Sequence, residues 1–373
     1  MDRYVKLPFY AKASLLILGI FTFGSMMYVA RQILVPIIVA VIVAILLHPV
    51  KNFFMRLKLG RVASIIITIT IAFLLVAGLG LFIVLQFSRF TETFPALVGK
   101  IDSFMTETIY WISGFFDIST SRMSNWIEST KADIVAKSAQ AIGQTLVTIG
   151  GLFVALLLIP VYIFMILYYE PIIIEFIRRS FHDGHRHKVS KIISEVKTLI
   201  QSYLSGLFVE MIIVAALDIA ALLILGVEYA ILLGILAALL NLIPYLGGII
   251  GVALPMMIAF VTENSPWVAV WVLVAFYIIQ LIDNNYIVPK IVASKVKINA
   301  LVSVIVVIGF GALWGIPGMF MSIPLTAIIK LIADHVDSLK PFGFLLGDTM
   351  PEPAGENDII EALPPHRNKS ITG

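Results

Sequence analysis

The sequence has 373 residues, of which 60% are hydrophobic and only 13% are charged. Soluble domains are about 45–50% apolar, so the composition excludes an ordinary soluble protein and indicates a membrane protein. The net charge of +3 is small and gives no support for nucleic-acid binding. Cysteine is absent, which excludes disulfides, thiolate metal sites and a cysteine nucleophile.

Apolar runs near or above the length needed to cross a bilayer recur along the chain, and because they do not alternate they predict helices. The first is followed by Arg31 and not by a small-residue cleavage pattern, so we expect a retained span. The candidate spans are residues 13–30, 33–47, 63–87, 146–169, 206–225 and 267–282, with longer runs at 229–261 and 301–332. The predicted fold is an all-α polytopic integral membrane protein with about eight membrane segments.

Lysine and arginine in short loops predict the orientation, because basic loops remain in the cytoplasm. Basic residues fill the loop 51–61, the segment 170–201 and the loop 290–297. These segments and both termini are therefore expected to be cytoplasmic. Residues 88–145 have nearly balanced charges and two tryptophans, Trp111 and Trp126, so they predict an external pair of amphipathic helices.

This orientation requires each of the two longer runs to start and finish on one side of the membrane, so each is expected to be a re-entrant helical hairpin. Helix breakers lie in the middle of both runs. They are Pro244, Gly247 and Gly248 in the first run, and Gly315, Pro317 and Gly318 in the second. One kinked span per run is the alternative, because proline and glycine are common in membrane helices. Span, hairpin, span and hairpin would form an inverted repeat, which is typical of secondary transporters.

The expected organisation has six parts. An N-terminal membrane hairpin with the third span (1–87) precedes an external amphipathic segment (88–145) and the fourth span (146–169). A basic cytoplasmic helical linker (170–204) then leads to a transport half that holds the two helix breaks (205–335). The remainder (336–373) is a proline-rich, partly disordered cytoplasmic tail.

Ionisable groups inside spans are costly and are therefore candidates for function. Asp218 lies deep in the span 206–225, and Glu210 lies eight positions earlier on roughly the same helix face. Further candidates for ion or substrate binding are Asn241, Tyr245, Gln280, Asp283, Asn284 and Asn285. Side-chain oxygens beside broken helices suit a hard cation or a polyol. A purely structural role for the carboxylates, and helix-end capping by residues 283–285, are the alternatives.

Motifs of soluble chemistry are missing from the sequence. We find no serine, histidine and acid combination and no phosphate-binding glycine loop, so no enzyme activity, cofactor or metal site is expected. His182, His185 and His187 form a small cluster, but their basic neighbours disfavour a metal cation, and a solvated turn is expected instead.

Three stretches resemble the AI-2E transporter family of bacterial membrane proteins. They are residues 34–36 through 44–50, residues 241–248, and Pro289 through 311–315, Gly318 and 323–325. The resemblance implies eight membrane segments, a homo-oligomer in the bacterial cytoplasmic membrane, and transport. The family includes exporters of autoinducer-2 and proteins linked to Na⁺ or H⁺ exchange.

The leading hypothesis is a secondary transporter that exports a small polar solute or exchanges cations, driven by an ion gradient, with Asp218 as the coupling group. A dedicated Na⁺/H⁺ antiporter is one alternative. A membrane scaffold or sensor without transport activity is the other. The expected partners are the lipid bilayer, a small solute, Na⁺ or H⁺, and further copies of the chain.

Overall fold

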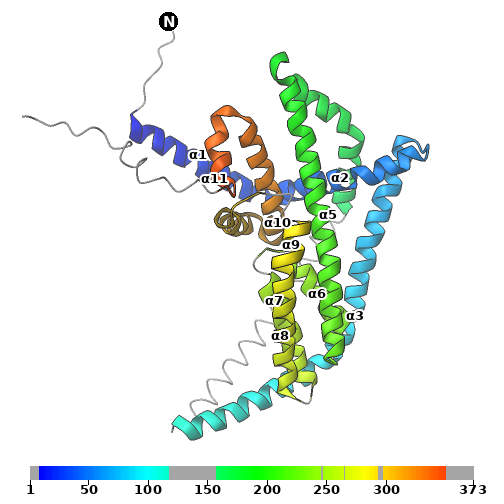
Figure 1. The fold of residues 1–373 in the computed structure, drawn as a ribbon, viewed down its shortest axis with the longest axis vertical. Coiled ribbons are helices and arrows are strands. Elements are labelled where there is room, and N and C mark those ends of the chain that lie inside the picture. Colours follow the sequence, from blue (N-terminus) through cyan, green and yellow to red (C-terminus); the bar gives the residue numbers. More distant parts are fainter. Residues whose placement is uncertain (1–7, 117–156, 245–246, 264, 293–296, 350–373) are drawn as a thin grey trace, which may run out of the picture.

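The computed structural model describes residues 8–116, 157–244, 247–263, 265–292 and 297–349. Helices account for the regular structure of these ranges, in which no strand occurs, and seven of them are long and apolar enough to cross a membrane. The prediction of an all-α polytopic membrane protein is therefore confirmed (Figure 1). In order, the helices are α1 (Phe9–Val29), α2 (Arg31–Arg56), α3 (Arg61–Phe116), Leu157–Arg179, α5 (Arg186–Ile224), α6 (Ala230–Asn241), α7 (Gly247–Thr262), α8 (Pro266–Ile282), η2 (Asp283–Ile287), α9 (Val288–Ile291), α10 (Ala300–His335) and α11 (Lys340–Leu346).

The first two helices do not form the expected N-terminal hairpin. Only Ala30 separates α1 from α2, and Figure 1 shows the two helices following one another instead of folding back. An antiparallel pair of helices needs a connection of about two to eight residues, which a single residue does not supply. No residue of α1 is buried within the chain.

Two helices run through boundaries at which the sequence predicts a change of segment. Helix α3 continues without a break past residue 87 to Phe116, so the span and the start of the segment that is expected to be external are one helix. Helix α5 likewise joins the basic linker to the fifth span. Residues 117–156, which include the second expected external helix, lie outside the described ranges.

The first long run is a helical hairpin made of α6 and α7. A methyl group at Gly251 would lie 3.3 Å from the carbonyl oxygen of Ala237, and one at Gly247 would overlap the carbonyl of Leu240. These paired positions show that the two helices pack side by side in opposite directions. On its other side α6 approaches α5 closely, because a methyl group at Gly234 would lie 2.6 Å from the side chain of Ile219.

The second long run is interrupted inside α10 at Gly315. This residue has φ 67° and ψ −148°, a left-handed conformation that glycine adopts without steric cost. Beyond it the chain folds back locally, since a methyl group at Gly318 would meet the carbonyl of Phe310 and one at Gly311 would lie 2.6 Å from the side chain of Met319. The break therefore lies where the sequence predicts it, although length and composition alone make α10 a single candidate span.

Candidate functional site: a cavity with three buried carboxylates

A cavity of about 870 Å³ lies within the bundle formed by α5, α6, α7 and α8. Its volume is in the range of small-molecule sites, about 300–1,000 Å³. Most of the wall is apolar, with Leu207, Val214, Phe276 and Ile279 among its residues. The polar and ionisable residues of the wall are Tyr203, Glu210, Asp218, Asn241, Tyr277, Gln280, Asp283, Asn284 and Ser303.

Three carboxylates line this cavity, and all are buried in the protein. Glu210 is 5% exposed, Asp218 is 3% exposed and Asp283 is 1% exposed. Glu210 and Asp218 belong to α5, about 12 Å apart along its axis, while Asp283 comes from the end of α8. The described lining residues include no lysine, arginine or histidine. Buried charges are costly without compensation, so the arrangement suits a proton or another cation.

Some carboxylate oxygens of the cavity make no hydrogen bond to a described residue and could accept one from a ligand. Asn241 donates from Nδ2 to Oδ2 of Asp283 over 3.0 Å. The second oxygen of that carboxylate, Oδ1, and Oε2 of Glu210 have no hydrogen-bond partner among the described residues. Buried polar atoms are almost always paired in proteins, so two carboxylate oxygens without a described partner make this cavity a candidate binding site.

A π-helical turn places Asp283 in the cavity wall. The N–H of Val288 bonds to the carbonyl of Asp283, one residue farther back than in an α-helix, and Pro289 supplies no N–H to the helix. Such π-turns occur frequently at functional sites. Gln280 and Asn284 also face the cavity, and their side chains are joined by a 3.4 Å hydrogen bond.

The α6–α7 turn borders the same cavity through Pro244, Gly247 and Gly248. A methyl group at Gly248 would lie 2.6 Å from Oε1 of Gln280, so glycine allows the backbone of α7 to approach α8. Tyr245 lies outside the described residues.

The structure does not place two parts of the expected site in the described wall of this cavity. Asn285 is exposed and donates to the carbonyl of Leu281 over 2.8 Å, so it caps the local backbone and does not face the cavity. The second break, at Gly315, Pro317 and Gly318, is not among the described lining residues, so the two breaks do not enclose one site. Helix α10 contributes Ser303 and Ile323 instead.

Three polar lining residues, Tyr203, Tyr277 and Ser303, were not predicted from the sequence. Tyr203 precedes Glu210 by seven positions, which places both on one face of α5, and this spacing could have identified it. Ser303 lies near the start of α10, and no spacing from a candidate carboxylate in the sequence pointed to it.

The substitution Gly247→Ala is expected to destabilise the hairpin by about 1–3 kcal/mol, because the added methyl group meets backbone that cannot rotate aside. Thermal unfolding in detergent measures the effect. Gly78→Ala is the matched control, since nothing lies within 4 Å of the added methyl group in α3. Equal midpoints for the two variants would contradict the close α6–α7 packing.

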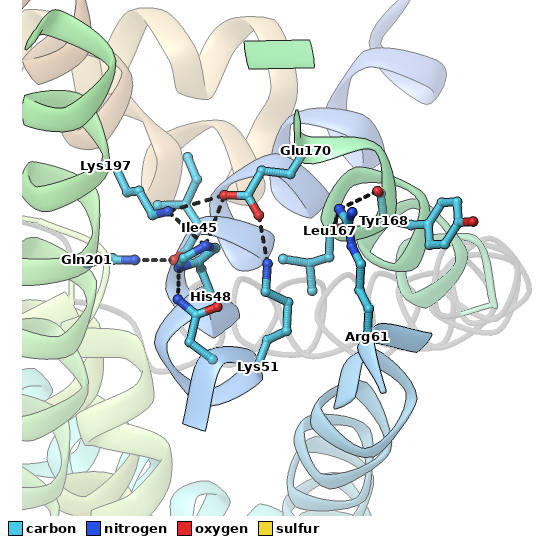
Figure 2. A network of polar contacts seen from close by, with 10 residues as sticks. Ile45, His48, Lys51, Arg61, Leu167, Tyr168, Glu170, Lys197 and Gln201 are labelled. Atoms are coloured by element: carbon cyan, nitrogen blue, oxygen red, sulfur yellow. Dashed lines mark hydrogen bonds and ion pairs between the residues drawn. The ribbon is translucent and has the colours of Figure 1, made fainter. Parts of the chain in front are cut away.

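A second polar cluster connects α2, the helix Leu157–Arg179 and α5 (Figure 2). We call it the polar junction, and its members are His48, Lys51, Glu170, Lys197 and Gln201. Glu170 accepts from Lys51 over 2.7 Å and from Lys197 over 3.2 Å, and its Oε1 is 3.0 Å from Nε2 of His48. Lys51 is only 4% exposed, although the sequence places it in a cytoplasmic loop.

Prolines inside the helices explain two further contacts drawn in Figure 2. Pro49 cannot donate to the carbonyl of Ile45, and Gln201 supplies the missing donor over 2.8 Å. Pro171 cannot donate to the carbonyl of Leu167, and Arg61 approaches that oxygen at 3.2 Å. Side chains from other helices thus satisfy backbone groups that proline leaves free, as lipid surroundings require.

Comparison with known proteins covers nearly the whole described region. Residues 15–338 match the sequence pattern that defines AI-2E family transporters. The AI-2 transport protein TqsA of Escherichia coli is 26% identical over 334 residues, which cover 86% of this chain and 90% of TqsA. YueF of Bacillus subtilis, provisionally named a transport protein, is 23% identical over 330 residues, which cover 83% of this chain and 86% of YueF. PerM of Escherichia coli, provisionally named a permease, is 27% identical over 332 residues, which cover 86% of this chain and 91% of PerM. With a matching region of this length and apolar helices that fit a multi-pass membrane protein, the chain belongs to the AI-2E transporter family.

Proposed function

We propose that the chain is a secondary transporter of the bacterial cytoplasmic membrane that moves a small polar solute through the cavity in exchange for H⁺ or Na⁺. The observation that carries this proposal is the set of three buried carboxylates without a basic side chain among the described lining residues. In apolar surroundings such carboxylates take up a proton or a cation. They are spread along the cavity, which suits successive binding of small cations.

The amide side chains supply the solute-binding groups in this proposal. Asn241, Gln280 and Asn284 offer both donors and acceptors to hydroxyl groups of a polar solute. The α6–α7 turn borders the same cavity, so movement of this hairpin would open or close access to the carboxylates. The name of TqsA as an AI-2 transport protein supports transport of an AI-2-like solute.

Purified protein in liposomes separates transport from the alternative of a membrane scaffold or sensor. An imposed proton or sodium gradient is expected to drive uptake of an autoinducer-2-like polyol, and proton movement is followed with an internal pH dye. Cation exchange without solute uptake would identify a dedicated Na⁺/H⁺ antiporter. Absence of both fluxes across a solute panel would contradict the proposal and favour a scaffold or sensor.

Further copies of the chain are part of the proposal. The described chain buries no residue of α1, whose apolar side chains include Phe9, Phe21 and Phe23, each at least 64% exposed. A homo-oligomer would give this helix protein neighbours in addition to lipid. Native mass spectrometry of the purified protein measures the number of copies.

The orientation makes a separate prediction. We expect His187→Cys to react with a membrane-impermeant maleimide only after cells are opened, because residue 187 is exposed and lies in the basic segment that we propose is cytoplasmic. Glu228→Cys, in the loop after α5, is expected to react in intact cells. The absence of native cysteine makes both signals specific. Labelling of position 187 in intact cells would reverse the topology.

A further inference from the structure

A second, largely apolar cavity of about 670 Å³ lies among α2, the helix Leu157–Arg179, α5 and α10. It is separate from the carboxylate cavity and shares no lining residue with it. Its wall is dominated by branched aliphatic side chains, and we call it the isoleucine cavity. Its isoleucines are Ile45, Ile166, Ile173, Ile174, Ile177, Ile192, Ile193, Ile328 and Ile332.

Packing and hydration limit what can occupy such a space. Protein interiors are close-packed, with few voids larger than a water molecule. The aliphatic part of this wall offers no hydrogen-bond partner to water, which needs two to four polar partners. Among molecules that surround a membrane protein, the acyl chain of a lipid has the matching apolar surface.

The polar residues at the border of the isoleucine cavity favour a negatively charged head group. Lys188 borders it and is 43% exposed. Asp337 lines the cavity as well, but its ion pair with Lys188 is long, at 3.8 Å, and the same carboxylate lies 2.7 Å from Lys340. Lys188 is therefore weakly compensated and can turn to another anion.

The surroundings of this border are basic as well. His185 also lines the cavity, and the exposed Arg178 and Arg179 lie at the end of the adjoining helix Leu157–Arg179. Lys197 also lines the cavity and shares the carboxylate of Glu170 with Lys51. Basic pockets between membrane helices bind the head groups of anionic lipids.

We propose that the isoleucine cavity holds an acyl chain of an anionic phospholipid whose phosphate lies against Lys188. Such a lipid would fill the space between α2 and α5 beside the polar junction. The inference concerns a site apart from the transport cavity and does not rest on the proposed function.

Native mass spectrometry of protein equilibrated with mixed phosphatidylglycerol and phosphatidylcholine micelles tests the site. The wild-type protein is expected to retain phosphatidylglycerol preferentially. Lys188→Ala should lower that retention about fivefold, since one lysine contributes about 1 kcal/mol to attraction of an anionic lipid. Lys191→Ala is the matched control, because Lys191 is exposed on the same helix, pairs with Glu195 and does not line the cavity.

A second pair of variants tests the acyl chain. Ile192→Trp should fill the cavity and reduce retention of the lipid, whereas Ile172→Trp, at a position 65% exposed, should not. Equal retention of the two lipids, or equal loss in Lys188→Ala and Lys191→Ala, would indicate surface lipid only and overturn the proposal. A bound mass that matches a free fatty acid would overturn the phospholipid. Size-exclusion chromatography shows whether each variant is folded. If Ile192→Trp is not folded, the comparison of Lys188→Ala with Lys191→Ala decides the test.

Discussion

Asp218→Asn is expected to reduce ion-driven flux to the level of liposomes without protein, while the protein remains folded. Asparagine has nearly the shape of aspartate, but its uncharged amide neither takes up a proton near neutral pH nor neutralises a bound cation. Removing a buried charge that lacks a basic partner among the described cavity residues should not lower stability. The measurements are gradient-driven flux in liposomes and thermal unfolding in detergent.

Glu228→Gln provides the control, because Glu228 is exposed in the loop after α5 and lies outside the cavity. Its flux should equal that of the wild type. Asp283→Asn should also lose coupling, since its carboxylate has one oxygen bonded to Asn241 and one without a described partner. Unchanged flux and unchanged ion dependence in Asp218→Asn would reduce Asp218 to a structural residue.

Glu170→Gln should lower the free energy of unfolding by about 3–5 kcal/mol, because it removes the carboxylate that, among the described residues, compensates the buried Lys51. Lys197 and His48 lose the same partner, so contacts of α2 and α5 with the helix Leu157–Arg179 weaken together. Thermal unfolding in detergent, calibrated with denaturant, measures the loss.

Glu175→Gln is the matched control on the same helix. Glu175 pairs with Arg179 over 2.8 Å, but both side chains are exposed, so its removal should cost less than about 1 kcal/mol. The double substitution Glu170→Leu with Lys51→Met should recover much of the loss, since no unpaired buried charge remains at Lys51. Equal stability of Glu170→Gln and Glu175→Gln would show that the polar junction contributes little.

The polar junction also bears on how the transporter could move. Lys197 and Gln201 attach α5 to the N-terminal helices, whereas Glu210 and Asp218 of the same helix line the cavity. If the transport half (205–335) moves against the N-terminal helices during transport, either these contacts break or α5 bends between them and the carboxylates. Gly206 lies in that interval, where a methyl group would be 2.7 Å from the carbonyl oxygen of Ile291.

Local chemistry made much of this protein predictable from its sequence. Apolar length predicts spans, since a helix is the structure that satisfies its own backbone in lipid. Proline and glycine act on the backbone where they stand, so the breaks near Pro244 and at Gly315 were located correctly. A carboxylate inside an apolar run is conspicuous for the same reason, and Glu210, Asp218 and Asp283 lie in one cavity.

Tertiary structure decided what depends on residues far apart in the chain. The order of charges in the sequence places Lys51 in a loop, and its burial follows only from the position of Glu170, which lies 119 residues later. Gln201 gains its role because packing brings it to the carbonyl of Ile45, which lies 156 residues earlier and which Pro49 leaves without a donor. The membership of the carboxylate cavity was decided in the same way: Ser303 enters its wall and Asn285 does not, because packing of α10 and the π-turn set which side chains face inward.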